Sequence, residues 1–361
     1  MIQNKSMLKT YEKLMKKCFS LALQSGGKNI PNPYVGAVVY DEKNDKIISF
    51  GYHKLFGAPH AEVEAIRKAK NKTKGKTLVV NLEPCSHYGK TPPCADLIIE
   101  SGFKKVVVGC LDPNPKVSGR GIKKLKEAGI EVITGVLEEQ AKELNRVFIK
   151  NITTKTPYIM LKTAVTLDSR IATKEKKSKW ITNDKARIEV QKLRSSYQAI
   201  MSASGTILTD NPMLNVRIKN KKNPARIIFD PNNKIPLNYN VFNNDKTRII
   251  LVNNSDIKVR EGIEKIPFEG FLELFQSLYR MGICSIMVEA GAGFCTQLFK
   301  HSLVDEINQF IAPKIFGSGP CFVEGLDTKE IVDCIELEKT KIKKIGDNFL
   351  INGRIKKKGS F

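Results

Sequence analysis

Four residues in the first hundred positions have the types and spacing of a metal-dependent catalytic site. His60 and Glu62 open the helical stretch HAEVEAIRKAK. Cys85 follows the strand-like run TLVVNL, and Cys94 directly precedes the run ADLIIE. One imidazole and two thiolates are a known ligand set for a catalytic zinc, whose fourth position is left to water. We therefore expect zinc at His60, Cys85 and Cys94.

Glu62 has the type and position of a proton carrier. Zinc deaminases pair the metal with a glutamate that is not a ligand and that moves protons between the water, the ring and the leaving amine. Residues two apart on an ideal helix point about 200° away from each other, so His60 and Glu62 converge only around a first turn. Helix N-termini also favour a thiolate, and Cys85 lies at a strand-to-helix junction.

A structural zinc site is the alternative. It would need a fourth Cys or His, and His87 is the obvious candidate because it follows Cys85 by two residues. We favour the open site because it also explains Glu62. The remaining cysteines show no paired ligand spacing, and we interpret them as structural; they are at positions 18, 110, 284, 295, 321 and 334.

Length and composition indicate a globular chain with two domains. The chain has 361 residues, 41% hydrophobic and 27% charged, and single cores stop growing at about 250 to 300 residues. The formal charge of +23 would suit nucleic acid. Its lysines and arginines are scattered, however, as a codon bias toward A and T would produce, whereas a binding patch should cluster. We expect no nucleic-acid partner, although the charge would favour an anionic substrate.

The sequence contains no membrane or export signal. No stretch approaches the roughly 18 consecutive apolar residues of a membrane helix, and the N-terminal segment lacks the apolar region of a signal peptide. We therefore expect a cytoplasmic protein with no membrane partner, whose eight cysteines are thiols unless a metal binds them.

Short β-branched runs alternate with helical stretches, which predicts an α/β layer fold. The first series runs from about position 35 to 148. In the second, strands are expected at YIMLKTAV, AIMSAS, ARIIFD, TRIILVNN and SIMVEA, with helices at 184–195 and 271–281. The polar segment 151–157 predicts a boundary between domains 1–150 and 151–361.

Long motifs in the first half resemble a known enzyme family. Eight residues separate the cysteines of PCSHYGKTPPC, whereas two separate them in ordinary cytidine and tRNA deaminases. Together with PNPYVGAVV at 31–39, GAPHAEVEAI at 57–66 and DPNPKVSGRGIKKLKEAGI at 112–130, this spacing resembles the bifunctional riboflavin-biosynthesis deaminase/reductase family.

The resemblance implies a cytidine-deaminase-like, three-layer α/β domain that deaminates a diaminopyrimidinone carrying a phosphoribosylamino group. The family's zinc ligands match His60, Cys85 and Cys94, and its proton shuttle matches Glu62. Its residues that hold the pyrimidine and the phosphate match Asn32, His53 and Lys90.

Taken by itself, the second half gives little sign of a function. It contains no Walker loop, metal cluster or nucleophile triad. The stretch EAGAG at 289–293 follows a strand-like run and precedes a helical one, so its N–H groups could bind a phosphate. A small-residue turn for tight packing explains the stretch equally well.

The order of motifs in this half resembles the reductase of the same family, with KTAVTLDSR at 162–170, SKWIT at 178–182, SGTILTDNPMLNVR at 204–217 and VEAGAGF at 288–294. This implies a dihydrofolate-reductase-like domain in which NADPH delivers hydride to the ribose side chain of the deaminated product. The positions that match NADPH contacts are Ala164, Trp180, Thr206, Asp210, Gly291, Ala292, Gly293, Phe294, Cys295, Thr296 and Gln297. Those that match substrate contacts are Ser178, Arg194, Leu214, Arg217 and Glu289.

Three of these residues also have plainer interpretations. Arg194 and Arg217 would suit a phosphate monoester, which a guanidinium binds through two parallel hydrogen bonds, but both could be ordinary surface charges. Trp180 is the only tryptophan. Without the resemblance we would expect it to pack in the core.

Four residues depart from the family pattern. Ser169 and Ala203 stand where glycine is usual. Asn211 replaces the second aspartate of the usual DDP, and Ala290 replaces the first glycine of the usual EGG. A Cβ at a former glycine can block a positive φ or a close backbone approach, at a cost of about 1 kcal/mol. The chain is therefore either a two-step enzyme or a deaminase with an inactive reductase domain. A nucleic-acid deaminase or binding protein is a remote alternative, and the sequence leaves homo-oligomerisation open.

Overall fold

The structure is a computed structural model that describes residues 2–86, 88, 92–114 and 118–356. The chain divides into two compact units, Met1–Lys155 and Thr156–Phe361. The segment 151–157, expected as the boundary, begins inside a helix that ends at Thr154 and leads into a strand that starts at Tyr158. None of the described helices is long and apolar enough to cross a membrane.

The first unit is a five-stranded sheet between helices. Its strands are β1 (Gly36–Asp41), β2 (Lys46–Tyr52), β3 (Thr77–Leu82), β4 (Lys105–Cys110) and β5 (Glu131–Ile133), in the order β2-β1-β3-β4-β5. Strands β3, β4 and β5 are parallel, and β1 is antiparallel to both of its neighbours. Its helices are α1 (Ile2–Leu23), α2 (Ala61–Ala69), α3 (Cys94–Glu100), α4 (Arg120–Glu127), α5 (Glu138–Leu144) and α6 (Arg146–Thr154).

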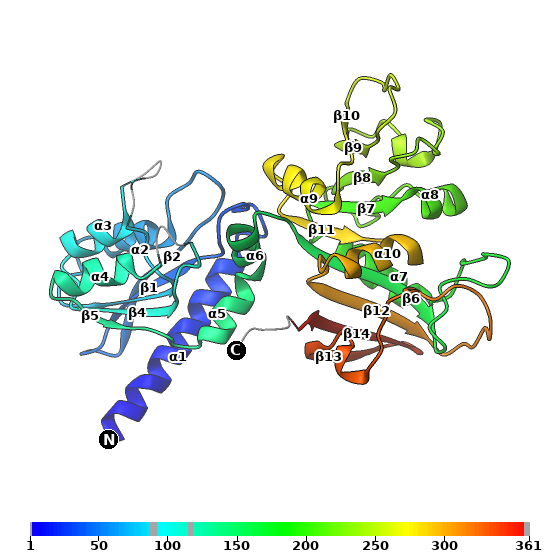
Figure 1. Ribbon diagram of the computed structural model, residues 1–361. Coiled ribbons are helices and arrows are strands. Elements are labelled where there is room, and N and C mark those ends of the chain that lie inside the picture. Colours follow the sequence, from blue (N-terminus) through cyan, green and yellow to red (C-terminus); the bar gives the residue numbers. More distant parts are fainter. Residues whose placement is uncertain (1, 87, 89–91, 115–117, 357–361) are drawn as a thin grey trace. The chain divides into compact units, whose positions relative to one another are not determined.

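Alternation along the buried strands divides the core of this unit into two faces. Val38 packs with Tyr11 and Met15 of α1, which covers one face (Figure 1). Its neighbour Val39 packs with α2 and α3 on the other face. Gly36 lets α1 approach the sheet closely, since a Cβ there would lie 2.2 Å from the carbonyl oxygen of Cys18.

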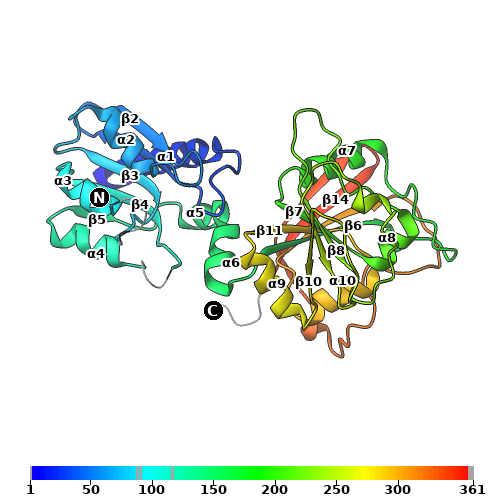
Figure 2. The ribbon, with the colours of Figure 1, turned by 90° about the horizontal axis from the view of Figure 1, so that it is seen from above.

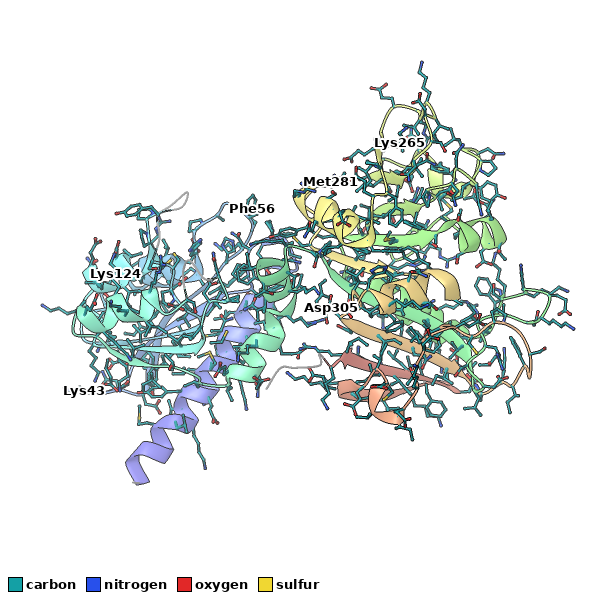
Figure 3. All side chains as sticks on the ribbon, viewed as in Figure 1. Lys43, Phe56, Lys124, Lys265, Met281 and Asp305 are labelled. Carbon is teal, nitrogen blue, oxygen red and sulfur yellow. The ribbon has the colours of Figure 1, made fainter. Side chains whose placement is uncertain are left out.

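The second unit is a nine-stranded sheet in the order β10-β9-β8-β7-β11-β6-β12-β14-β13. Its strands are β6 (Tyr158–Thr166), β7 (Ala199–Ala203), β8 (Ala225–Phe229), β9 (Ile249–Val252), β10 (Ile263–Ile266), β11 (Ser285–Val288), β12 (Glu306–Ala312), β13 (Leu337–Ile345) and β14 (Asn348–Ile355). The pairings are parallel except those of β14, which is antiparallel to both of its neighbours, β12 and β13. Asp305, labelled in Figure 3, exchanges hydrogen bonds with Ile159 and aligns β12 on β6.

Helices cover both faces of this sheet. The helices α9 (Phe271–Arg280) and α10 (Ala292–Lys300) pack on one face, and α7 (Asp184–Arg194) and α8 (Ser204–Asp210) on the other. Figure 2 shows α7 on one side of the strands and α9 and α10 on the opposite side. The short 3-10 helices η1 (Asn240–Phe242) and η2 (Ile331–Asp333) lie in the connecting loops.

The expected strands β6 to β9 and β11 and the expected helices α7 and α9 are present. The patterns did not predict α1, β2, the part of α6 after Phe148, α8, β10 or the last three strands. In β13 the run LEKTKIKKI is exposed along nearly its whole length, because an edge strand needs no apolar face and is often lysine-rich.

Candidate active sites

Three elements of the first unit bring the predicted metal ligands together. His60 is the N-cap of α2, Cys85 lies in the loop after β3, and Cys94 is the first residue of α3. His60 Nδ1 lies 3.3 Å from Cys94 Sγ and 3.6 Å from Cys85 Sγ. In the described part of the chain, these residues form the only group of three or more His, Cys, Asp or Glu that could hold a metal.

The spacing of these atoms suits zinc. A tetrahedral zinc, with bonds of about 2.0 Å to nitrogen and about 2.3 Å to sulfur, separates its ligand atoms by about 3.5 to 3.8 Å. The three atoms all lie within 4.8 Å of one another. Two residues considered above, His87 and Lys90, lie outside the described residues.

Glu62 lies beside these ligands and is buried. It is the second residue of α2, and His60 before it has an extended backbone, as the spacing of the two residues requires. Burial raises the pKa of Glu62 to about 7, against the opposing effect of His60. A carboxyl group that titrates near neutral pH can both accept and return a proton.

Asn32 and His53 form a second group at this site. Asn32 Nδ2 donates to His53 Nε2 at 3.0 Å, so His53 Nδ1 carries the proton and donates to the carbonyl oxygen of Pro59 at 3.1 Å. Burial lowers the pKa of His53, which favours this neutral form. The His53 ring meets the His60 ring edge-on, with centroids 5.5 Å apart. His53 thus lies next to the predicted metal ligand His60, and Asn32 is joined to His53.

The second unit has a cavity of about 1030 Å³. It opens at the carboxyl ends of β7, β8 and β11, where open α/β sheets bind ligands. All of the NADPH and substrate positions expected in this unit line it except Cys295 and Thr296. Those two side chains face the interior of the unit, where Cys295 Sγ contacts the Ala290 carbonyl and Thr296 Oγ1 donates to the Glu324 carbonyl at 2.8 Å. Burial of these side chains does not test a contact through the backbone, so both positions stay predictions.

A charged group lies in this cavity. Arg194 binds Glu289 through two hydrogen bonds, of 2.6 and 3.1 Å, and Lys162 Nζ lies 3.4 Å from the same carboxylate. Burial alone would raise the pKa of Glu289, but the two cations lower it to about 2. Because Arg194 is engaged by Glu289, the exposed Arg217 is better placed to bind a phosphate.

Trp180 lies at the cavity and is 60% exposed. The Arg187 guanidinium covers its ring at 4.4 Å from the centroid. The core-packing alternative for Trp180 was therefore wrong.

Comparisons with known proteins match both units. Residues 157–351 match the RibD C-terminal domain, and residues 8–110 match the cytidine and deoxycytidylate deaminase zinc-binding region. The chain is 43% identical over 345 residues to the riboflavin biosynthesis protein RibD of Aquifex aeolicus, covering 93% of this chain and 96% of that protein. It is 36% identical over 364 residues to that of Escherichia coli, covering 94% and 98%. This chain belongs to the RibD family.

Solved structures agree with this assignment. The diaminohydroxyphosphoribosylaminopyrimidine deaminase/5-amino-6-(5-phosphoribosylamino)uracil reductase of Thermotoga maritima is 40% identical, with a TM-score of 0.85, over 97% of this chain and 100% of that one. RibD of Acinetobacter baumannii is 33% identical, also with a TM-score of 0.85 and the same coverage. The chain is thus a bifunctional deaminase and reductase of riboflavin biosynthesis with cytidine-deaminase-like and dihydrofolate-reductase-like domains, as the sequence predicts.

Only one of the four departures from the RibD pattern places a Cβ on a strained backbone. Ser169 has φ +63°, a left-handed conformation that favours glycine. Ala203 is extended, with φ −108°, and Ala290 is not among the residues with positive φ. Asn211 has φ +41°, but asparagine tolerates this region. The strain expected from the former glycines therefore applies to Ser169.

Two residues that the structure places in or beside these sites were not singled out from the sequence. Lys162 is one, although it begins the motif KTAVTLDSR. The other is Glu83, whose buried carboxylate accepts hydrogen bonds from the N–H groups of Asp112, Gly119, Gly121 and Ile122. Glu83 thereby fixes the start of α4 next to the loop that carries Cys85. The motif EPC was the only feature of the sequence that pointed to Glu83. Its hydrogen-bond partners lie 29 to 39 residues later in the chain, so no local pattern contains them.

Proposed function

We propose that the first unit deaminates a diaminopyrimidinone carrying a phosphoribosylamino group, and that the second unit reduces the ribosyl side chain of the product with NADPH. The observation that carries this proposal is the convergence of Glu62 with three zinc-type ligands. The large cavity with cationic walls in the other unit supports the second step.

In the deaminase step, His60, Cys85 and Cys94 would hold a zinc ion, which lowers the pKa of a water molecule to near neutral. Glu62 takes a proton from the attacking water and passes it to the ring nitrogen as the oxygen adds to the carbon. It then takes the remaining proton of the added hydroxyl and gives it to the amine, so that the C–N bond breaks, the carbonyl forms and ammonia leaves. The pair Asn32 and His53 orients the pyrimidine, and Lys90 binds its phosphate.

In the reductase step, the cavity holds cofactor and substrate together. Its volume of about 1030 Å³ lies at the top of the usual range for one small ligand, about 300 to 1,000 Å³. The first three N–H groups of α10, at Ala292, Gly293 and Phe294, have no acceptor within the helix and suit the cofactor's phosphates. The remaining NADPH contacts are those that the resemblance implies.

The chemistry requires a hydride and a proton. The bond between ribose C1′ and the ring oxygen breaks, hydride adds to C1′, and the ring oxygen takes a proton. Lys162 is the nearest ammonium group to Glu289 in the cavity and supplies that proton. Arg217 binds the substrate phosphate. The expected cytoplasmic location, and the expected lack of nucleic-acid and membrane partners, stay predictions.

The test is to incubate the full-length, zinc-loaded protein with the proposed pyrimidine and NADPH, and to follow ammonia and the reduced-nicotinamide absorbance together. We expect both signals in the wild type and neither in Glu62→Gln. Lys162→Met should release ammonia without oxidising NADPH. Ammonia without NADPH oxidation in the wild type would mean a deaminase with an inactive reductase domain. The absence of both signals in the wild type would refute the proposal.

A further inference from the structure

The segment that carries Arg217 has a backbone held by side chains. Residues 211–217 belong to no helix or strand. Within the described part of the chain, residues 212–217 make no hydrogen bond to another backbone group. Leu214 in this segment is buried and has a left-handed backbone, with φ +48°. A leucine keeps such a conformation only where its surroundings hold it there.

Two side chains of α7 hold this segment. Arg194 Nη1 donates to the carbonyl oxygen of Asn215 at 2.9 Å, and the backbone N–H of Arg217 donates to Gln191 Oε1 at 2.8 Å. Gln191 and Arg194 are three residues apart, so they lie on the same face of the helix. Both line the cavity, and Gln191 is buried. The bond from Gln191 therefore fixes the backbone of the residue whose guanidinium is exposed.

Arg194 joins this segment to the charged group of the cavity. While its Nη1 binds the carbonyl of Asn215, its Nε and Nη2 bind Glu289. The phosphate and C1′ of the substrate ribose are a fixed number of bonds apart, so the phosphate must be bound at a set distance from the Glu289 group for C1′ to react. Binding a remote phosphate aids a reaction only when it places the reacting atom correctly. The position of Arg217 relative to Glu289 depends on α7.

We infer that Gln191 is a positioning residue of the reductase, which fixes the backbone of Arg217 and thereby the place of the substrate phosphate. This inference rests on the proposed function, in which Arg217 binds that phosphate. A guanidinium binds phosphate through two parallel hydrogen bonds, which need a defined orientation. Without the bond to Gln191, Arg217 and its segment would have to be ordered when the substrate binds, at a cost in conformational entropy.

The experiment uses the full-length, zinc-loaded protein and follows NADPH oxidation with the deaminated pyrimidine and with the same pyrimidine lacking its phosphate. Gln191→Met keeps the length of the side chain but loses the acceptor oxygen, and Gln191→Asn is one methylene shorter. Gln198→Met is the matched control, since Gln198 Oε1 accepts from the backbone N–H of Cys284 at 2.6 Å and Gln198 does not line the cavity. Arg217→Met is measured alone and combined with Gln191→Met.

We expect both Gln191 variants to lower kcat/KM for the phosphorylated pyrimidine about fivefold, as for the loss of one hydrogen bond. The KM for NADPH should not change, which also shows that the variants fold, and the control should match the wild type. With the unphosphorylated pyrimidine, and in the Arg217→Met background, Gln191→Met should have no further effect, because no bound phosphate remains to be positioned.

Four results would overturn the inference while leaving the proposed function standing. They are an equal loss with the unphosphorylated pyrimidine, an equal loss in Gln198→Met, additive losses in the double variant, and no loss at all. A wild type that does not oxidise NADPH with the deaminated pyrimidine would instead overturn the proposed reduction, and the inference with it.

Discussion

The backbone N–H of Cys94 donates a hydrogen bond to Sγ of Cys85, over a distance of 3.3 Å. This bond joins the first turn of α3 to the loop after β3, so one predicted metal ligand is fixed by the element that carries another. The Cys94 thiol, the same N–H group and His60 all act to lower the pKa of Cys85. The thiolate needed for metal binding is thus favoured by the N-terminus of a helix, as expected from the strand-to-helix junction.

Replacing Cys94 with alanine should remove the metal and the deaminase activity only. We expect zinc content, measured by atomic emission, to fall from one ion per chain to near zero. Ammonia release should fall more than about a thousandfold, as when one member of a catalytic unit is removed. NADPH oxidation with the deaminated product should persist, because the reductase cavity is built from the other unit. Cys110→Ala, at an equally buried cysteine of the first unit, should retain zinc.

Gly121→Ala should disturb the deaminase site without touching a proposed ligand. The new Cβ would lie 2.1 Å from the carbonyl oxygen of Pro84, which precedes Cys85, and such overpacking typically costs about 1 to 3 kcal/mol. We expect weaker zinc retention under a chelator and slower ammonia release. Gly205→Ala is the control, since a Cβ there meets nothing within 4 Å. Normal zinc retention in Gly121→Ala would contradict the close packing of α4 on this loop.

Glu289→Gln should destabilise the second unit in a pH-dependent way. The pKa of Glu289 is lowered from 4.5 to about 2 in the folded protein. The ionised carboxylate therefore contributes fully to the free energy of unfolding above pH 4.5, and this contribution is lost as the pH falls toward 2. A shift of this size corresponds to about 3 kcal/mol. In urea unfolding followed by Trp180 fluorescence, the difference from wild type should be largest near neutral pH and shrink below pH 4.5. Glu264→Gln, in an exposed pair with Arg248, should show a much smaller difference at every pH.

Ser169→Gly should stabilise the second unit, and Ala203→Gly should not. A left-handed backbone costs a non-glycine residue about 1 to 2 kcal/mol, and the flexibility of glycine offsets about 0.5 to 1 kcal/mol of the gain. We therefore expect the free energy of unfolding to rise by roughly 0.5 to 1 kcal/mol in Ser169→Gly. Ala203 has an extended backbone, so glycine there relieves no strain. Ala203→Gly should therefore lower the free energy of unfolding by a similar amount. The same fluorescence-monitored unfolding measures both, and a loss of stability in Ser169→Gly would show that its backbone is not strained.

The sequence by itself determined the chemistry of the first unit. The residue types at positions 60, 62, 85 and 94 are those of a zinc deaminase, and their spacing requires a helix start that α2 provides. Such features are local, because a cap, a first turn or a strand end depends on a few neighbouring residues. The motifs of the second unit likewise indicated a reductase, and most of their residues do line one cavity.

The tertiary structure alone decided which of these side chains meet. Lys162 and Glu289 are 127 positions apart and become neighbours only because β11 pairs with β6. The same packing lets Glu289 engage Arg194, and it turns Cys295 and Thr296 into the core while their neighbours in α10 face the cavity. The order of the strands and the face that each helix turns to the sheet depend on burial over the whole unit, because every apolar face must pack against another apolar face. No short window of sequence contains that information.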